Sequence, residues 1–181
     1  AHDSGFYIGT WGSTVDFDST EDFNGSLELD IYGGWGTSIG EDSTIDVGYI
    51  YYAYPGDDNG AEGNYQEFYL NYGWRGLSLG AAFSNDYYGS SGTFWYLQAN
   101  YDWGYAENWN LSLHAGYNNF QEDIFLSSDK GNYWDYSVGV TWSVVGVDLG
   151  LACVRTNLTE EDLFGTQWGD DTAVFSISKS F

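Results

Sequence analysis

Apolar and polar residues alternate with a period of two along most of this chain, and no other sequence feature constrains its fold as much. The alternation is clearest at 27–32, 110–117, 135–142 and 147–153. Successive side chains of a β-strand point to opposite faces, so this period predicts strands with one apolar and one polar face. The stretch from Gly5 to Trp11 does not resolve cleanly into two faces. We expect strands at residues 5–17, 25–36, 43–54, 64–74, 77–87, 93–103, 109–119, 133–144, 146–157 and 172–181.

The composition agrees with a single all-β domain over residues 1–181. Aromatic residues make up 20% of the chain, and there are 25 glycines but one proline. Disordered segments contain few aromatic residues, and glycine weakens helices. Strands favour tyrosine and tryptophan, and turns favour glycine. Cys153 is the one cysteine and cannot form an internal disulfide. No apolar run of about 18 residues predicts a transmembrane helix.

The charge of the chain is strongly acidic. Asp and Glu number 27, against the basic residues Arg75, Lys130, Arg155 and Lys179, which gives a net charge of −23. No basic patch is present that could release counterions from phosphates, so nucleic acid is excluded as a partner. The same charge argues against simple docking on anionic lipid and suits cations as solutes or bridging ions.

Three features favour a barrel in a membrane over a soluble β-sandwich. Tight connections at 74–76 and 144–146 alternate with long acidic loops at 55–63, 120–132 and 158–171, which is typical of outer-membrane barrels. The last segment alternates and ends in Phe181, which we interpret as a membrane-insertion signal. Tryptophans near predicted strand ends match an aromatic girdle: Trp35, Trp74, Trp103, Trp142 and Trp168. We therefore predict an antiparallel transmembrane β-barrel in the outer membrane of a Gram-negative bacterium. Its secretion leader is expected to have been removed or to lie outside this sequence.

Several stretches resemble a family of proteobacterial outer-membrane proteins known as TorF-family porins. They are HDSGFYIGTWGS at 2–13, ELDIYGG at 28–34, DVGYIYYAYPG at 46–56 and SISKSF at 176–181. The resemblance spans nearly the whole chain and implies a small barrel; it supplies no functional residues. Members of that family usually have further residues before the Gly-Phe-Tyr stretch, which implies twelve strands in a full-length member where this sequence predicts ten.

The polar faces of the predicted strands carry carboxylates that have few basic partners. Buried carboxylates are costly unless they are hydrated or bound by cations, so we expect a water-filled, acidic lumen. Tyr32, Tyr52 and Tyr69 are expected to narrow its bore. The predicted pore lining consists of Glu28, Asp30, Tyr32, Asp46, Glu67, Tyr69, Asn71, Asp135 and Asp148. On this period, Leu29, Leu113, Val140 and Leu149 should face lipid, while Asp30, Ser112, Thr141 and Asp148 should face the lumen.

The remaining acidic residues crowd the long loops. Calcium or magnesium ions could bridge them through oxygen ligands, and the alternative is a solvated, repelling surface. The candidate metal ligands are Asp57 with Asp58, and Glu160 with Glu161 and Asp162. No other cofactor is expected.

Enzyme motifs are absent from the sequence. There is no nucleophile elbow, phosphate loop or zinc-ligand spacing. His114 stands alone in the middle of a predicted strand and is interpreted as a lumen histidine with a hydrogen-bond partner. We therefore predict a protein without catalytic residues.

The favoured function is a narrow channel for small solutes, cationic or neutral by preference, because rings of acidic side chains select cations without a chemical step. The alternatives are a closed structural barrel whose acidic loops bind partners or divalent cations, a membrane enzyme, and a soluble β protein. The expected partners are outer-membrane lipid, lipopolysaccharide, the insertion machinery and further copies of the chain in a homo-oligomer.

Overall fold

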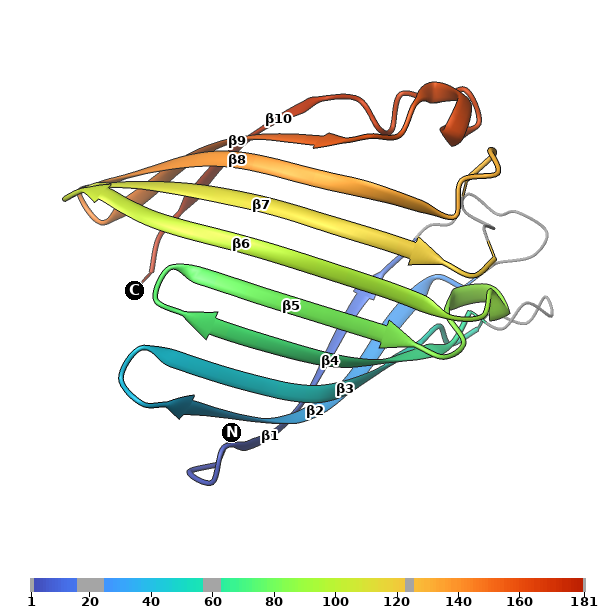
Figure 1. Cartoon of the computed structure of the whole chain (residues 1–181), viewed down its shortest axis with the longest axis horizontal. Helices are drawn as coiled ribbons and strands as arrows, with labels where there is room; N and C mark the ends of the chain where they lie inside the picture. The colour runs from blue at the N-terminus through green and yellow to red at the C-terminus, as the bar shows by residue number, and fades with distance from the viewer. Residues whose placement is uncertain (1, 16–24, 57–62, 123–125, 181) are drawn as a thin grey trace.

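A computed structural model describes residues 2–15, 25–56, 63–122 and 126–180. They form one antiparallel sheet of ten strands (Figure 1). The strands are β1 (Phe6–Thr14), β2 (Leu27–Ile39), β3 (Ser43–Ala53), β4 (Tyr65–Trp74), β5 (Leu77–Ser84), β6 (Phe94–Ala106), β7 (Trp109–Phe120), β8 (Asn132–Val144), β9 (Val147–Thr156) and β10 (Thr172–Ser178). Two 3-10 helices, η1 (Tyr88–Ser90) and η2 (Glu160–Leu163), lie in the connections. Within the described ranges, no helix is long and apolar enough to cross a membrane. The predicted all-β fold of ten antiparallel strands is confirmed.

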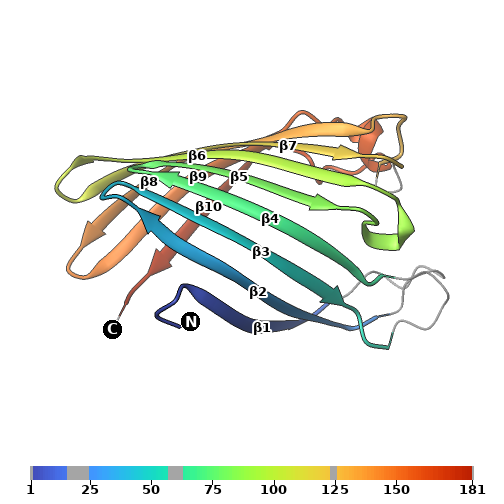
Figure 2. The same cartoon turned by 60° about the horizontal axis from the view of Figure 1, so that its bottom comes forward.

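Each strand pairs with the strands before and after it in the chain. The sheet curls from β1 to β10, and both chain ends lie at the end that carries the short turns (Figures 1 and 2). Over the described residues, β1 pairs with β2 and β10 with β9, and the pairings include none between β1 and β10. The structure is therefore an incompletely closed barrel with two edge strands.

The connections alternate in length as the sequence predicts. Short turns at 40–42, 75–76, 107–108 and 145–146 join strands at one end, which we call the turn end. Longer connections at 15–26, 54–64, 85–93, 121–131 and 157–171 lie at the other, which we call the loop end. Arg75 and Val145 have φ angles of 52° and 51°, the left-handed conformation that two-residue hairpin turns require.

Strand boundaries differ from the predicted ones by a few residues. β2 and β6 continue to Ile39 and Ala106, whereas β5 ends at Ser84 and the chain then turns into η1. Strand ends are the least certain part of a sequence pattern, because turn chemistry and alternation overlap there. Residues 16, 17 and Phe181, predicted to lie in the first and last strands, fall outside the described residues.

The two faces of the sheet differ in chemistry. Residues directly opposite each other in paired strands share a face, so the register assigns every strand residue to one side. One side, which we call the inner face, contains the buried strand side chains Asp30, Tyr65, Ser84, Phe94, Asn118 and Phe120. The other, the outer face, contains Leu29, Leu113, Val140 and Leu149, opposite in parity to Asp30, Ser112, Thr141 and Asp148. The predicted division of these residues between two faces is confirmed.

The outer face is apolar in the middle and aromatic towards both ends. Leu97, Leu113 and Val138 expose 49%, 40% and 53% of their surface in its centre. Aromatic side chains of the turn end include Trp74, Trp103, Trp109 and Trp142, and those of the loop end include Trp95, Tyr117, Trp134 and Tyr136. Trp168, predicted to lie near a strand end, lies in the connection after η2 and is 78% exposed, so it belongs to neither belt.

Candidate functional site

The register brings every residue of the predicted pore lining to the inner face. These residues are Glu28, Asp30 and Tyr32 on β2, Asp46 on β3, Glu67, Tyr69 and Asn71 on β4, Asp135 on β8 and Asp148 on β9. Asp102 on β6 joins them. The described strands contribute no Lys or Arg side chain to this face, because Arg75 lies in a turn, Lys130 in a loop, Arg155 on the outer face and Lys179 beyond the end of β10. The inner face is therefore strongly negative.

Two tyrosines and one carboxylate form a bridge across the first strands. Tyr7, Gly34, Gly48 and Tyr69 occupy one register row across β1 to β4. The two tyrosine rings lie over the two glycines, and their hydroxyl oxygens meet at 2.6 Å. The Tyr7 hydroxyl also donates to Asp46 Oδ2 at 2.7 Å. Side chains separated by 62 residues in sequence are thereby joined along the wall.

The rings of Tyr32 and Tyr69, which are predicted to narrow the bore, each lie against a glycine of a neighbouring strand. Tyr32 lies against Gly9, its register partner on β1, and Tyr69 lies against Gly48. A glycine has no side chain, so the neighbouring ring can lie flat on the backbone instead of projecting from it. Both rings therefore cover the wall of the sheet.

A second polar cluster surrounds His114 in the middle of β7. Its Nε2 lies 2.7 Å from Asp135 Oδ1 and its Nδ1 lies 2.6 Å from Asn100 Oδ1. Asn118 donates to Asp135 Oδ2 at 3.0 Å, and the Tyr96 hydroxyl lies 3.2 Å from His114 Nε2. The prediction of an inner histidine with a hydrogen-bond partner is confirmed. The cluster also satisfies both carboxylate oxygens of Asp135.

Asp30 lacks comparable partners. Its side chain is 6% exposed, and its Oδ1 atom makes no hydrogen bond among the described residues. Trp11 and Tyr52 are its register partners on β1 and β3. The Tyr52 hydroxyl donates to Glu67 Oε2 at 3.3 Å, so Tyr52 connects the surroundings of the two carboxylates.

An aromatic cluster covers the inner face at the loop end. Tyr65 stacks on Tyr52 with ring centroids 4.3 Å apart, and Tyr87 contacts Tyr65 at 4.7 Å and Phe94 at 4.2 Å. Phe94 in turn contacts Phe120 at 4.9 Å. Burial raises the pKa of Tyr87, in the loop after β5, to about 12, so its hydroxyl stays neutral. Sequence analysis missed this cluster; its signal is the aromatic residues that occupy polar-face positions where strands meet the long loops.

The loops after β7 and β9 pack on each other above this cluster. Lys130 Nζ donates to Asp162 Oδ2. The Ser127 amide donates to the Asp162 carbonyl at 2.8 Å, and the Phe164 amide donates to Ser127 Oγ at 2.7 Å. Leu126, Leu158 and Leu163 lie beneath this contact with the aromatic side chains, around a cavity of about 270 Å³.

The predicted metal site at Glu160, Glu161 and Asp162 is not assembled. The Asp162 carboxylate accepts hydrogen bonds from the Thr159 amide and hydroxyl, which cap η2, as well as from Lys130. Within the described parts of the chain, no group of three His, Cys, Asp or Glu side chains could hold a metal ion. Asp57 and Asp58 lie outside the described residues, so the prediction for that pair stays a prediction.

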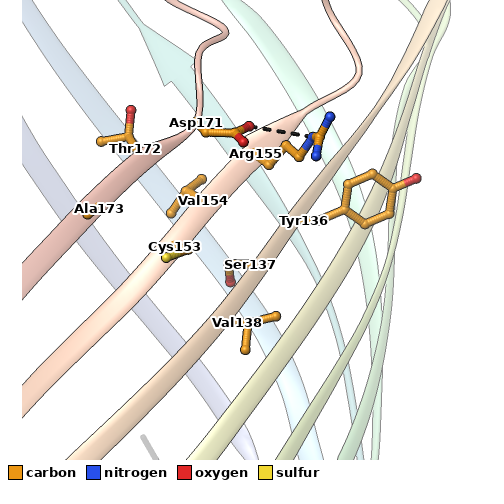
Figure 3. Close-up of a pocket in the computed structure, with 9 residues that line it drawn as sticks. All are labelled: Tyr136, Ser137, Val138, Cys153, Val154, Arg155, Asp171, Thr172 and Ala173. Atoms are coloured by element: carbon orange, nitrogen blue, oxygen red, sulfur yellow. Dashed lines mark ion pairs between the residues drawn. The ribbon is translucent and has the colours of Figure 1, made fainter.

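A separate groove lies on the outer face where β8, β9 and β10 approach the loop end (Figure 3). It has a volume of about 370 Å³ and includes Tyr136, Val138, Cys153 and Ala173 in its lining. Arg155 Nε lies 3.5 Å from Asp171 Oδ1 at its rim, and both side chains are 70% exposed. The register places Tyr136, Val138, Cys153, Arg155 and Ala173 of its lining on the outer face, and Ser137, Val154 and Thr172 on the inner face.

The comparisons with known proteins agree with a porin-like β-barrel fold. The family model described as "Bacterial protein of unknown function (Gcw_chp)" matches residues 1–181, so the chain belongs to that family. Among solved structures, the chain is similar to the NanC porin at 10% sequence identity and a TM-score of 0.58, over 98% of this chain and 95% of that chain. This likeness shows the fold. The comparison with curated proteins gave no match.

Proposed function

We propose that this protein is a porin-like channel of the bacterial outer membrane that lets small solutes, cationic or neutral by preference, pass without a chemical step. One observation carries the proposal: the inner face of the described strands holds carboxylates at both ends and in the middle but neither lysine nor arginine. Charges inside a narrow space with low-dielectric walls focus their potential, so cations would be concentrated and anions repelled.

The outer face supports a membrane location. Its central leucines and valines are exposed to the surroundings, and aromatic belts flank them on both sides, as in barrels that cross a bilayer. The porin-like fold and the resemblance to TorF-family porins point the same way. Outer-membrane lipid and lipopolysaccharide would contact this face, and the insertion machinery would recognise the chain through Phe181. Assembly into a homo-oligomer stays a prediction.

The proposal is tested by neutralising two inner carboxylates at the loop end. Glu28→Gln together with Asp30→Asn removes negative charge with little change in side-chain volume. The reversal potential of the protein in planar bilayers under a salt gradient should show cation preference, and the double variant should show less of it. Substitutions in a lumen mainly change selectivity, so the double variant should still fold. Anion preference in the unmodified protein would contradict the proposal.

A closed structural barrel, with loops that bind partners or divalent cations, is the second candidate. The observation in its favour is the aromatic cluster of Tyr65, Tyr87, Phe94 and Phe120 with the packed loops above it. Ten strands leave a narrow interior once large side chains point inwards. A correctly folded protein that conducts no current would favour this candidate.

A further inference from the structure

One inner carboxylate differs from the others in having a buried oxygen without a partner. Asp46 accepts from Tyr7, Asp135 contacts His114 and Asn118, and Asp148 accepts from Ser143. Asp30 Oδ1 is buried and makes no hydrogen bond among the described residues. An ionised carboxylate withdrawn from water is costly unless a positive group satisfies it. The described inner face supplies neither lysine nor arginine for this purpose, so any cation that satisfies Asp30 has to come from outside the described sheet.

The side chains around Asp30 indicate what kind of cation this partner is. Trp11 and Tyr52 flank it on the neighbouring strands, and Tyr65 is the next residue of the same register row. Directly opposed residues on one face have Cβ atoms roughly 4.5–5.5 Å apart, so both rings lie within reach of a group held at Asp30. Trp11 is 52% exposed, which leaves its indole ring accessible.

A carboxylate between aromatic rings suits an organic ammonium group better than a metal ion. The ring faces attract an alkylated ammonium through their quadrupoles and replace its weak hydration, while the carboxylate supplies the charge. A calcium or magnesium ion needs several oxygen ligands in its first shell. Asp30 has no such set around it, because no three acidic or histidine side chains of the described residues converge to hold a metal.

We infer that Trp11, Asp30, Tyr52 and Glu67 form a binding site for organic ammonium ions, which we call the Asp30 site. It deepens the proposed channel function, on which it rests, by naming the class of solute. The site lies towards the loop end of β1 to β4, beside the aromatic cluster, where a solute entering from the loop end would arrive first. Tyr52 places the Glu67 carboxylate next to the site through its hydroxyl, so a second negative charge attracts the same cation.

Tetramethylammonium chloride is the probe for an equilibrium titration of the refolded protein in detergent micelles, at constant ionic strength set with sodium chloride. The unmodified protein should bind the probe saturably and in preference to sodium. Asp30→Asn should weaken binding roughly tenfold or more, since an interaction with a charged group is lost. Trp11→Leu should weaken it by about 2- to 30-fold, the range of one cation–π contact, and Trp11→Phe should restore part of the loss.

Matched controls are Glu107→Gln, which removes one carboxylate from an exposed turn, and Trp103→Leu, which removes one indole from the outer face. Neither should change the affinity for tetramethylammonium. Equal affinity in the unmodified protein and Trp11→Leu, or no preference over sodium, would overturn the Asp30 site. Heat-modifiable migration in electrophoresis verifies that each variant is folded.

Planar-bilayer recordings on the same variants separate the site from the channel. Tetramethylammonium should reduce the sodium current of the unmodified protein, and this reduction should be lost in Asp30→Asn. Binding without any current would overturn the channel function and leave the Asp30 site standing. Cation-selective current without tetramethylammonium binding would overturn the Asp30 site and leave the channel function standing.

Discussion

At the scale of single residues, the inner face depends on pairs in which a tyrosine covers a glycine. Tyr7 lies over Gly34 and Tyr69 over Gly48, which lets their hydroxyls meet next to Asp46. The glycines are required by close approach: a Cβ atom on Gly48 would collide with the Tyr69 ring and would also come within 2.8 Å of the Gly33 carbonyl oxygen. These pairs fix large polar rings against the wall.

Gly48→Ala should therefore destabilise the protein by about 1–3 kcal/mol, the usual cost of overpacking. The added methyl group must displace the Tyr69 ring and strain the pairing of β2 with β3. The free energy of unfolding in urea, measured on protein in lipid vesicles, checks this value. Gly104→Ala is the matched control, because a Cβ atom there meets nothing within 4 Å. An equal effect of the two substitutions would contradict the proposed role of the Tyr69–Gly48 contact.

Sequence reasoning placed the predicted lining residues on one face but did not predict the contacts among them. Period-two alternation assigned Glu28, Asp30 and Asp135 to one face, because parity alone decides this. It failed for 5–11, where Tyr7 and Trp11 on the inner face make that face as aromatic as the outer one. Cross-strand register resolves the ambiguity, and alternation within one strand contains no information on register.

At the scale of elements, the strands carry a gradient of polarity along the outer face. On β8, Val138 lies midway between Trp134 at the loop end and Trp142 at the turn end, and Val140 lies closer to Trp142. Thr141 is on the inner face opposite Asn110. If the outer face contacts lipid, the free-energy cost of a charged side chain should be highest at Val138 in the middle of the strand, lower at Val140, and lowest at Thr141 on the inner face.

Val138→Arg should cost about 2–4 kcal/mol of unfolding free energy, Val140→Arg less, and Thr141→Arg least, because a cation at the bilayer midplane is the most expensive. Urea unfolding from vesicles of one lipid composition compares the three. Thr141→Arg doubles as the control for adding a long cation to β8. If Thr141→Arg were the most destabilising, the assignment of faces would be reversed.

The loop contact made by η2 should respond to acid. Hydrogen bonds from Lys130, Ser128 and Thr159 hold the pKa of Asp162 well below its usual range. A carboxyl group with a lowered pKa in the folded protein stabilises it above the pKa of the unfolded chain, about 3.9. That stabilisation is lost as the pH falls from there towards the lowered value. Amide hydrogen exchange at Ser127 and Phe164 should therefore speed up between pH 4 and strongly acidic conditions, relative to amides in β7.

Lys130→Gln should produce faster exchange at these amides already at neutral pH, because the first cause of the lowered pKa is removed. Glu161→Gln is the control, since that exposed side chain neighbours Asp162 without taking part in its capping contacts. Unchanged exchange in Lys130→Gln would show that the loops hold together without this ion pair.

The sequence pattern predicted the strands but not the 3-10 helices, although η2 has a recognisable sequence signal. Long alternating segments at 110–117 and 135–142 lie inside β7 and β8, because the hydrophobic pattern and the strand geometry have the same period. For η2, the spacing of Thr159 and Asp162 is that of a capping box, which the structure forms. The predicted strand to residue 87 overran β5, because Tyr87 and Tyr88 have strand propensity but pack into the aromatic cluster instead.

At the scale of the whole molecule, the two edge strands decide whether the sheet can function in a membrane. β10 is exposed along its whole length, and β1 offers its free edge on the other side of the gap. Unpaired backbone N–H and C=O groups cost several kcal/mol each in hydrocarbon, so spanning sheets occur as closed barrels. We therefore expect β1 and β10 to pair with each other in the bilayer, unless further strands lie between them.

Cysteine pairs on the outer face distinguish direct closure from closure through additional strands. In a Cys153→Ser background, Ile8→Cys is combined in turn with Ala173→Cys, Phe175→Cys and Ile177→Cys; all four positions are exposed on the outer face. A disulfide requires Cα atoms roughly 4.4–6.8 Å apart, so direct antiparallel pairing should give a high yield for one combination and low yields for its neighbours. Ile8→Cys with Leu97→Cys on β6 is the negative control, because those strands are separated by β2 to β5. Absence of every cross-link in a folded, heat-modifiable protein would show that β1 and β10 are kept apart, and that ten strands alone do not close the barrel.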